Sequence, residues 1–205
     1  MLKHLINWAT FPIRVLTPQH LLHPLGLNTL ADDRTWAVLS YLRGTVLDIG
    51  CGENELVHKY GHGFGADVIA GKGVDLACDG AYLPFSDASF NTVTFLASLN
   101  HIPGRKRALR EAYRVLRPEG RLIITMIPRR VGWLCHRLIA HWDPDQRQRG
   151  MALGEVWGID REEVVHLLSE TGFLSPIVRR FGFLGLNTLY LTIKVARSRT
   201  NSRWV

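Results

Sequence analysis

The stretch Val46-Leu47-Asp48-Ile49-Gly50-Cys51-Gly52-Glu53-Asn54 decides the fold. Its first part is a short apolar run, typical of a strand buried in a parallel sheet, and a predicted helix at about 53–60 follows the glycines. Glycines between a strand and a helix bring bare backbone and a helix N-terminus against a ligand. The stretch therefore predicts a ligand-binding loop at the carboxyl end of a strand.

This loop lacks the residues that bind phosphate. A dinucleotide fingerprint requires a third glycine three residues after Gly52, but Glu55 stands there and Glu53 adds another acid. No Lys-Ser or Lys-Thr pair follows, which excludes a Walker-type loop. The loop suits a nucleoside-like ligand with a cationic end. An acid after the next strand is expected to hold ribose hydroxyls, and Asp67 fits this role better than Asp75.

Strands alternate with helices along the rest of the chain, which predicts an α/β fold with a mainly parallel sheet. Asp160 and Glu163 have the spacing of a capping box and predict the start of a helix at 161–170. The helix at 28–42 is expected to turn Trp36, Val38, Leu39 and Leu42 toward the core. The other predicted helices are 2–10 and 105–116, and the other predicted strands are 64–68, 74–78, 91–96, 122–127, 177–183 and 189–195.

The composition indicates one soluble globular domain. With 205 residues, 46% hydrophobic and 21% charged, the chain is long enough to bury a core and is neither disordered nor a coiled coil. The 25 Lys and Arg against 18 Asp and Glu give a net charge of +7, which predicts an anionic partner without choosing among nucleic acid, membrane and acidic substrate. The cysteines at 51, 78 and 135 follow no metal-ligand spacing, so we expect no metal. A cytoplasmic location is expected, because the first residues lack the features of a secretory signal.

Further motifs occur in order between residues 44 and 128. They are Val46–Gly52, Gly65–Asp67, Cys78–Asp87, Ser89–Asn91, Asn100–Ile102 and Arg114–Gly120. In these motifs the chain resembles the class I S-adenosylmethionine-dependent methyltransferases, and among them the methyltransferase type 11 group. The resemblance implies S-adenosylmethionine as cofactor and a Rossmann-like, seven-stranded, mainly parallel sheet flanked by helices, with the last strand antiparallel. Asn91, Asn100 and Glu119 depart from the family pattern, none of them at an implied cofactor contact.

The resemblance also assigns the predicted cofactor contacts. Gly50 and Gly52 would admit the methionine portion, Asp48 would lie near its amino end, and Asp67 would hold the ribose. The alternatives are that Asp48 merely caps its turn, that Asp79 is a surface loop acid and that Cys51 is a small core residue with no redox role. The full predicted set is Asp48, Gly50, Cys51, Gly52, Asp67, Asp79, Gly80 and Ala97, with Asp79 and Gly80 facing the adenine amino edge.

His101, just after the fourth strand, is the candidate general base. Methyl transfer from a sulfonium requires a base only when the acceptor arrives protonated, and the pKa of an imidazole suits that task near neutrality. The alternative is a structural histidine bonded to a loop carbonyl. Small-molecule O-methylation, of an anionic, aromatic or lipid-like acceptor, is therefore the favoured reaction.

Substrate contacts are expected in a lid at about 128–158. Arg130, Trp133 and His136 are the predicted substrate residues, because a basic and aromatic lid suits an anionic or flat acceptor. The alternative is an amphipathic helix at 131–142 that packs Trp133, Leu134 and Leu138 onto the sheet. The lid belongs to a predicted domain at 44–195, which lies between an N-terminal helical cover at 1–43 and a basic tail at 196–205.

Two possible partners, a membrane and nucleic acid, and one alternative function remain to be weighed. The apolar, mildly basic segment 1–16 either touches a membrane surface or covers the mouth of the site. Nucleic acid is disfavoured, because residues 97–100 read Ala-Ser-Leu-Asn where base-amine methylation requires an Asn/Asp-Pro-Pro-Tyr/Phe motif. A non-catalytic S-adenosylmethionine-binding or assembly protein is the main alternative to a methyltransferase, and an RNA methyltransferase is a weaker one.

Overall fold

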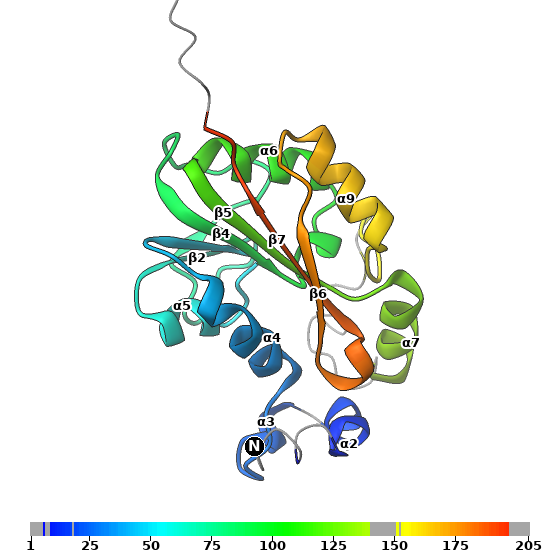
Figure 1. Cartoon of the computed structure of the whole chain (residues 1–205). Helices are drawn as coiled ribbons and strands as arrows, with labels where there is room; N and C mark the ends of the chain where they lie inside the picture. The colour runs from blue at the N-terminus through cyan, green and yellow to red at the C-terminus, as the bar shows by residue number, and fades with distance from the viewer. Residues whose placement is uncertain (1–5, 7–8, 18, 140–150, 152, 197–205) are drawn as a thin grey trace, which may run out of the picture.

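A seven-stranded sheet forms the centre of the computed structural model, which describes residues 6, 9–17, 19–139, 151 and 153–196 (Figure 1). The strand order is β3-β2-β1-β4-β5-β7-β6. All neighbours from β3 to β5 are parallel, whereas β7 is antiparallel to both β5 and β6. The predicted fold class is confirmed. The strands are β1 Val46–Ile49, β2 Gly63–Asp67, β3 Leu76–Ala77, β4 Phe90–Leu96, β5 Leu116–Met126, β6 Ile177–Phe181 and β7 Asn187–Ile193.

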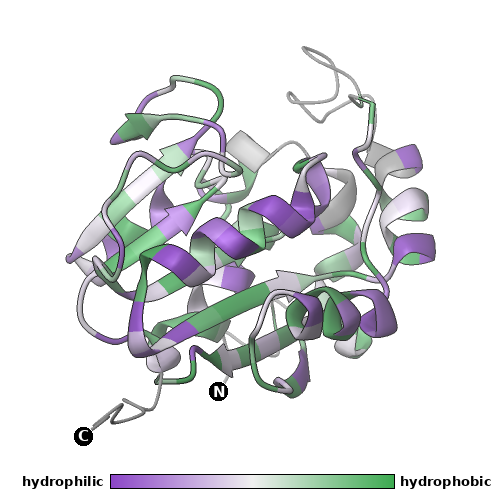
Figure 2. Ribbon diagram, turned by 90° about the horizontal axis from the view of Figure 1, so that it is seen from above, coloured by the Kyte–Doolittle hydropathy of each residue, from purple (hydrophilic) through white to green (hydrophobic). Residues whose placement is uncertain are grey.

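Helices cover both faces of the sheet. The α6 and α9 helices pack on one face through Leu109, Leu168 and their neighbours, and α4 and α5 pack on the other through Val38 and Leu56. Their outward turns are hydrophilic, while the strands between them are largely hydrophobic (Figure 2). The helices are α2 Phe11–Leu16, α3 Gln19–Leu22, α4 Leu30–Val38, α5 Glu55–Tyr60, α6 Arg105–Val115, α7 Arg129–Ile139 and α9 Arg161–Glu170, with short 3-10 turns at Leu39–Tyr41, Leu99–His101 and Phe183–Gly185.

The α4 helix differs from the sequence prediction in two respects: its start, expected at Asn28 or Asp32, and the exposure of Trp36. Thr29 is its N-cap, and Thr29 and Asp32 form a reciprocal capping box that the sequence interpretation missed. Trp36, expected in the core, is 58% exposed, with Lys59 5.5 Å from its ring centroid. Val38 and Leu42 are buried as predicted.

Asp160 makes a different contact from the one predicted. It is the N-cap residue of α9, but its side chain makes no capping hydrogen bond. Its Oδ1 instead accepts from the backbone N–H of Arg129, 3.0 Å away, and Arg129 also pairs with Glu163. These contacts fasten the start of α7 to the start of α9.

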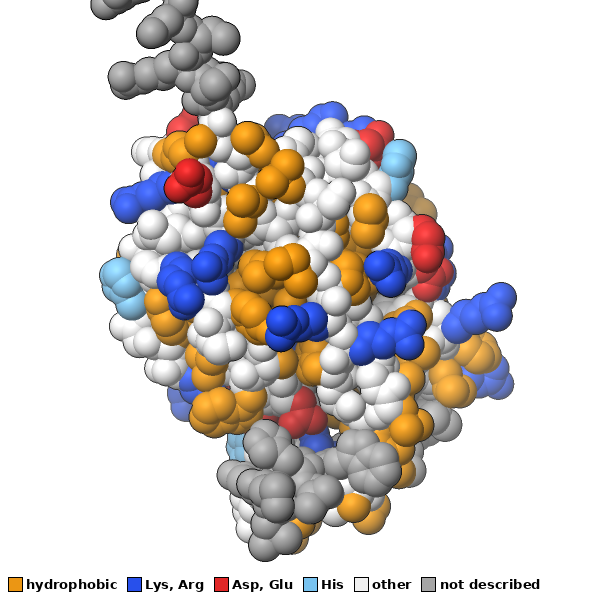
Figure 3. Space-filling model, in the orientation of Figure 1, with side chains coloured by type: hydrophobic (Ala, Val, Ile, Leu, Met, Phe, Trp, Pro, Cys, Tyr) orange, Lys and Arg blue, Asp and Glu red, His pale blue; other side chains and the backbone are white. Residues whose placement is uncertain are grey.

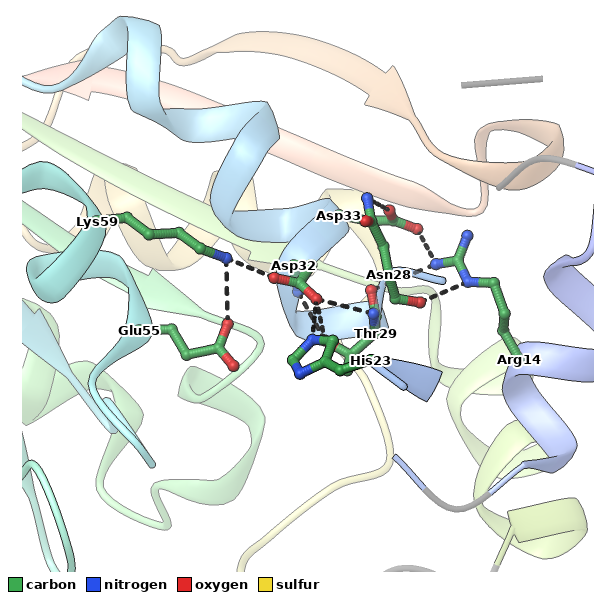
Figure 4. A network of polar contacts seen from close by, with 8 residues as sticks. All are labelled: Arg14, His23, Asn28, Thr29, Asp32, Asp33, Glu55 and Lys59. Carbon is green, nitrogen blue, oxygen red and sulfur yellow. Dashed lines mark hydrogen bonds and ion pairs between the residues drawn. The ribbon is translucent and has the colours of Figure 1, made fainter. Parts of the chain in front are cut away.

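A polar network joins the N-terminal segment to α4 and α5 (Figure 4). Arg14 of α2 is buried and pairs with Asp33, while Asp32 pairs with His23 and Lys59. Phe11 stacks on Phe183 in the turn between β6 and β7, with 4.5 Å between ring centroids. The helix predicted at 2–10 lies almost wholly outside the described residues, and so does the tail at 197–205. In the part of the chain that is described, no helix is long and apolar enough to cross a membrane.

Candidate active site at the carboxyl edge of the sheet

The candidate site lies where the loops after β1 and β4 leave the sheet. Chain connections run in opposite directions from β1 and β4, and open α/β sheets bind ligands at such a point. Gly50 has φ +71°, and a Cβ placed on it would lie 2.4 Å from the Cβ of Ser98. The Ser98 hydroxyl donates to the carbonyl of Ile49 at 2.5 Å. Gly50 is therefore required for the two loops to pack closely.

Gly52 and Asp67 form the open part of this loop. A Cβ on Gly52 would meet no atom within 4 Å, so its backbone faces open space. The N–H of Gly52 donates to Asp67 Oδ2 at 3.0 Å, and the N–H of Ile69 donates to Oδ1 at the same distance. Asp75 instead accepts from the N–H of Gly65 at 2.7 Å and from the Asn54 amide at 2.9 Å. The loop contact of Asp67 supports the choice of Asp67 over Asp75.

Asp48 is a buried carboxyl group in β1. Burial raises its pKa to about 7, a hydrogen bond from the Thr94 hydroxyl to Oδ1 lowers it in part, and Asp67 raises it again. Perturbed carboxyl groups of this kind cluster at functional sites. Burial also raises the pKa of Cys51 to about 12, which keeps its thiol protonated and unreactive.

Asp79 and Gly80 lie in the loop after β3, and Ala97 lies in the loop after β4. Asp79 is exposed, and its Oδ1 accepts from the N–H of Ala81 at 2.8 Å, as in an Asx turn. A Cβ on Gly80 would lie 2.7 Å from the side chain of Ile49, so the absence of a side chain brings this loop against the end of β1. Ala97 has φ +54°, an uncommon conformation for a residue with a side chain.

His101 pairs with a carboxylate that sequence reasoning did not select. Its Nδ1 lies 3.1 Å from Glu155 Oε2, and the Glu155 side chain is only 2% exposed. Two hydrogen bonds join Asn100 to the backbone of Val156, and the Arg105 guanidinium donates to the carbonyl of Gly154 at 2.8 Å. These contacts clamp residues 154–156 onto the loop after β4.

The lid helix α7 exposes two of the three side chains that were predicted to contact the substrate. Arg130 is exposed, and Trp133 and Leu134 are 47% and 50% exposed, so the alternative in which both pack onto the sheet is wrong. The guanidinium of Arg137 lies 5.3 Å from the centroid of the Trp133 ring. The side chains of His136 and Leu138 lie outside the described residues.

Comparison with known proteins agrees with this geometry. Residues 47–124 match the family model described as "Methyltransferase domain". A segment of 119 residues is 36% identical to 27-O-demethylrifamycin SV methyltransferase of Amycolatopsis mediterranei, covering 47% of this chain and 44% of that protein. These matches support the resemblance of residues 47–124 to the class I S-adenosylmethionine-dependent methyltransferases. The cofactor of this family is S-adenosylmethionine, and the chain spans less than half the length of that relative.

Solved structures extend the likeness of the methyltransferase domain to most of the fold. A possible histamine N-methyltransferase from Thermotoga maritima superposes with a TM-score of 0.63 at 20% identity, over 80% of this chain and 89% of that one. The 1,6-didemethyltoxoflavin-N1-methyltransferase from Burkholderia thailandensis, solved with its substrate and S-adenosylhomocysteine, gives 0.59 at 17% identity, over 92% and 88%. At these identities the likeness concerns the fold.

Proposed function

We propose that the chain transfers a methyl group from S-adenosylmethionine to a small molecule, with a hydroxyl oxygen as acceptor atom. The observation that carries this proposal is the His101–Glu155 pair, which lies after β4 at the same sheet edge as the Gly52–Asp67 contact. S-adenosylmethionine, when bound, supplies a methyl group already activated by a sulfonium. The protein then has to orient the acceptor, exclude water and remove the hydroxyl proton.

The residues at the edge fit the cofactor. Gly52 offers open backbone, and Asp67 stands at the end of β2, where its carboxylate has lone pairs left for the ribose hydroxyls. The buried Asp48 is placed for the amino end, and a cationic ligand group next to it would favour its ionised form. Asp79 and Gly80 remain our candidates for the adenine edge.

Glu155 explains why His101 is suited to proton removal. A carboxylate bonded to Nδ1 selects the tautomer whose Nε2 is the basic nitrogen and stabilises the imidazolium that forms. His101 would take the hydroxyl proton at Nε2, and S-adenosylmethionine, when bound, would supply the methyl group to the acceptor oxygen. The products are the methyl ether, S-adenosylhomocysteine and the protonated imidazole, which returns its proton to solvent.

The lid and the surface favour a small acceptor. The exposed Trp133 and Leu134 offer an apolar face beside the cation of Arg130, which suits an aromatic, anionic or lipid-like molecule. Lys and Arg side chains on the face shown in Figure 3 lie apart, separated by apolar and neutral surface, whereas nucleic-acid binding usually uses a continuous basic stripe. A cytoplasmic location fits a soluble substrate of this kind.

A membrane contact through residues 1–16 remains a secondary proposal. Ile6 and Ile13 are 45% and 60% exposed, which supports a surface contact. Arg14, however, is buried against Asp33 and adds no charge to that surface. The stacking of Phe11 on Phe183 supports instead the proposal that residues 1–43 cover the domain.

A methyl-transfer screen tests the proposal. The intact protein is incubated with methyl-labelled S-adenosylmethionine and panels of phenols, alcohols, carboxylates and amines, and the products are identified by mass spectrometry. We expect methyl ethers, and we expect His101→Ala to lower turnover at least about 100-fold while S-adenosylhomocysteine still binds. Cofactor binding without transfer to any acceptor would favour the non-catalytic alternative, and full turnover by His101→Ala would remove the base.

A further inference from the structure

Among the residues that the structure describes, none forms a hydrogen bond with the guanidinium of Arg34. It lies in α4, its Nε is buried, and no hydrogen bond or ion pair to it occurs within the described part of the chain. Burial lowers the pKa of Arg34, while the charge of Asp33 raises it. The side chain as a whole is half-buried, and leaving its buried nitrogen without a partner is costly, so we expect the guanidinium to meet an anion when a ligand binds.

The acids and bases around Arg34 have other partners. The carboxylate of Asp33, next to it in sequence, pairs with Arg14 and accepts from the amide of Asn28. Lys59 pairs with Asp32 and Glu55, across the other side of α4 (Figure 4). Arg34 is thus left out of the network that holds the N-terminal segment.

Arg34 lies in α4, a helix that borders the edge of the sheet at which the candidate cofactor site lies. Only a short segment separates the end of α4 from the start of β1, so α4 runs back along the sheet and its first turns lie toward the carboxyl edge, as does α7 (Figure 1). Arg34 and Cys135 of α7 are near enough for the charge of each to act on the pKa of the other, so α7 is the helix that faces Arg34. Both helices border the edge from which the β1 and β4 loops emerge.

The cofactor brings a negative charge for which the assigned residues offer no cation. Its amino-acid end carries a carboxylate as well as an ammonium group, but the charged residues assigned to the site, Asp48, Asp67 and Asp79, are all acids. A carboxylate among them requires a cationic donor, and a guanidinium binds it in a planar, bidentate geometry. We infer that Arg34 binds the methionine carboxylate of the cofactor. This inference rests on the proposed function and adds a cofactor-binding residue from outside the matched domain.

The test compares two ligands that share the adenosine thioether. S-adenosylhomocysteine has the amino-acid end, and 5′-methylthioadenosine lacks it. We expect Arg34→Gln to weaken S-adenosylhomocysteine about 10- to 100-fold by calorimetry and to leave 5′-methylthioadenosine within about twofold. The control is Arg43→Gln, because the Arg43 guanidinium donates to the carbonyls of Ser40 and Leu42 just before β1, and its replacement should change neither affinity.

Two further arms separate the outcomes. Decarboxylated S-adenosylhomocysteine should bind wild type about as weakly as intact S-adenosylhomocysteine binds Arg34→Gln. If wild type binds S-adenosylhomocysteine and its decarboxylated form with equal affinity, the inference is overturned, whatever the variant does. Arg34→Lys, which keeps the charge, replaces Arg34→Gln if the latter does not fold, and should show a smaller loss confined to S-adenosylhomocysteine. The inference is also overturned if Arg34→Gln loses equal affinity for S-adenosylhomocysteine and 5′-methylthioadenosine, or loses affinity for neither. It is likewise overturned if the variant weakens only the binding of the methyl acceptor. Failure of wild type to bind S-adenosylhomocysteine would instead reject the proposed function.

Discussion

Glu155 Oε2 lies 3.1 Å from His101 Nδ1, although the two residues are 54 positions apart in the sequence. Glu155 is nearly fully buried, while His101 keeps 27% of its side chain exposed. A buried carboxylate behind a partly exposed imidazole is the arrangement expected of a general base and the group that orients it. The lid segment supplies the carboxylate and the loop after β4 supplies the imidazole, so the pair forms only when both are in place.

Replacing Glu155 by Gln should separate catalysis from cofactor binding. The amide keeps the shape but cannot stabilise the imidazolium, so we expect turnover at neutral pH to fall about 10- to 100-fold. The rate should recover in part as the pH rises, because a larger fraction of the acceptor hydroxyl is then already ionised and needs no base, while the affinity for S-adenosylhomocysteine stays unchanged. Glu162→Gln, an exposed residue of α9, is the control for both measurements. An identical pH–rate profile in Glu155→Gln and wild type would reject the role of Glu155.

Gly50 and Gly52 should respond differently to alanine. Both have positive φ, so both variants carry backbone strain of about 1 kcal/mol. Gly50→Ala in addition forces a Cβ to within 2.4 Å of Ser98, and we expect a clear loss of stability in urea unfolding. Gly52→Ala meets open space, so it should fold nearly normally and lose cofactor affinity if the ligand occupies that space. If Gly52→Ala keeps the cofactor affinity of wild type, the ligand does not approach Gly52.

Asp48 should make the stability of the ligand-free protein depend on pH. Its pKa is raised to about 7 in the folded protein from an ordinary value of 3.8, so the folded state favours the protonated form. The stabilising contribution is therefore complete below about pH 4 and is lost as the pH rises toward 7. The total change is of the order of 4 kcal/mol, from about three pKa units. Chemical denaturation at pH 5 and 8 should show Asp48→Asn gaining on wild type as the pH rises, and a constant difference between them would contradict the raised pKa.

Arg14 should anchor the N-terminal segment. Its guanidinium is almost completely buried and pairs with Asp33, and it donates to the carbonyl of Asn28 at 2.7 Å. Arg14→Met keeps the apolar stem but leaves Asp33 without its cation, so we expect a loss of about 2–3 kcal/mol in unfolding free energy. Hydrogen exchange should quicken in residues 11–33 and remain unchanged in β4 and β5. Unaltered exchange in the N-terminal segment would show that Arg14 does not hold it.

Local patterns in the sequence were sufficient to predict the sheet and the glycine loop. The apolar runs that form β1, β4 and β5 are buried on both faces, and such runs are visible in any window of the chain. Asp67 lies at the end of β2, the strand after the glycine loop, where the sequence predicts it, and its contact with the ribose stays a prediction. Asn91 departs from the family pattern, and the structure shows its use, since its Oδ1 accepts from the N–H of Thr45 at 3.0 Å.

Contacts between distant segments were not predictable. Glu155 was one acid among several in the lid, and only the fold brings it to His101. Arg14 and Arg34 look alike in sequence. The carboxylate of Asp33 points toward α2 and pairs with Arg14 (Figure 4), whereas the buried Nε of Arg34 has no partner among the described residues. Trp36 was expected in the core because of its apolar spacing with Val38, Leu39 and Leu42. That spacing does not reveal that the ring is exposed and that Lys59 lies over it.

Calorimetry of S-adenosylhomocysteine binding to wild type and to Asp67→Ala tests the central claim most directly. Asp67 stands beside the open backbone of Gly52, whereas Asp75 braces the loop from below through Gly65 and Asn54, so Asp75→Asn is the comparison. We predict one site per chain in wild type, an affinity at least about 10-fold weaker in Asp67→Ala, and a smaller change in Asp75→Asn that follows its loss of stability. Absence of binding by wild type, or an unchanged affinity in Asp67→Ala, would contradict the account.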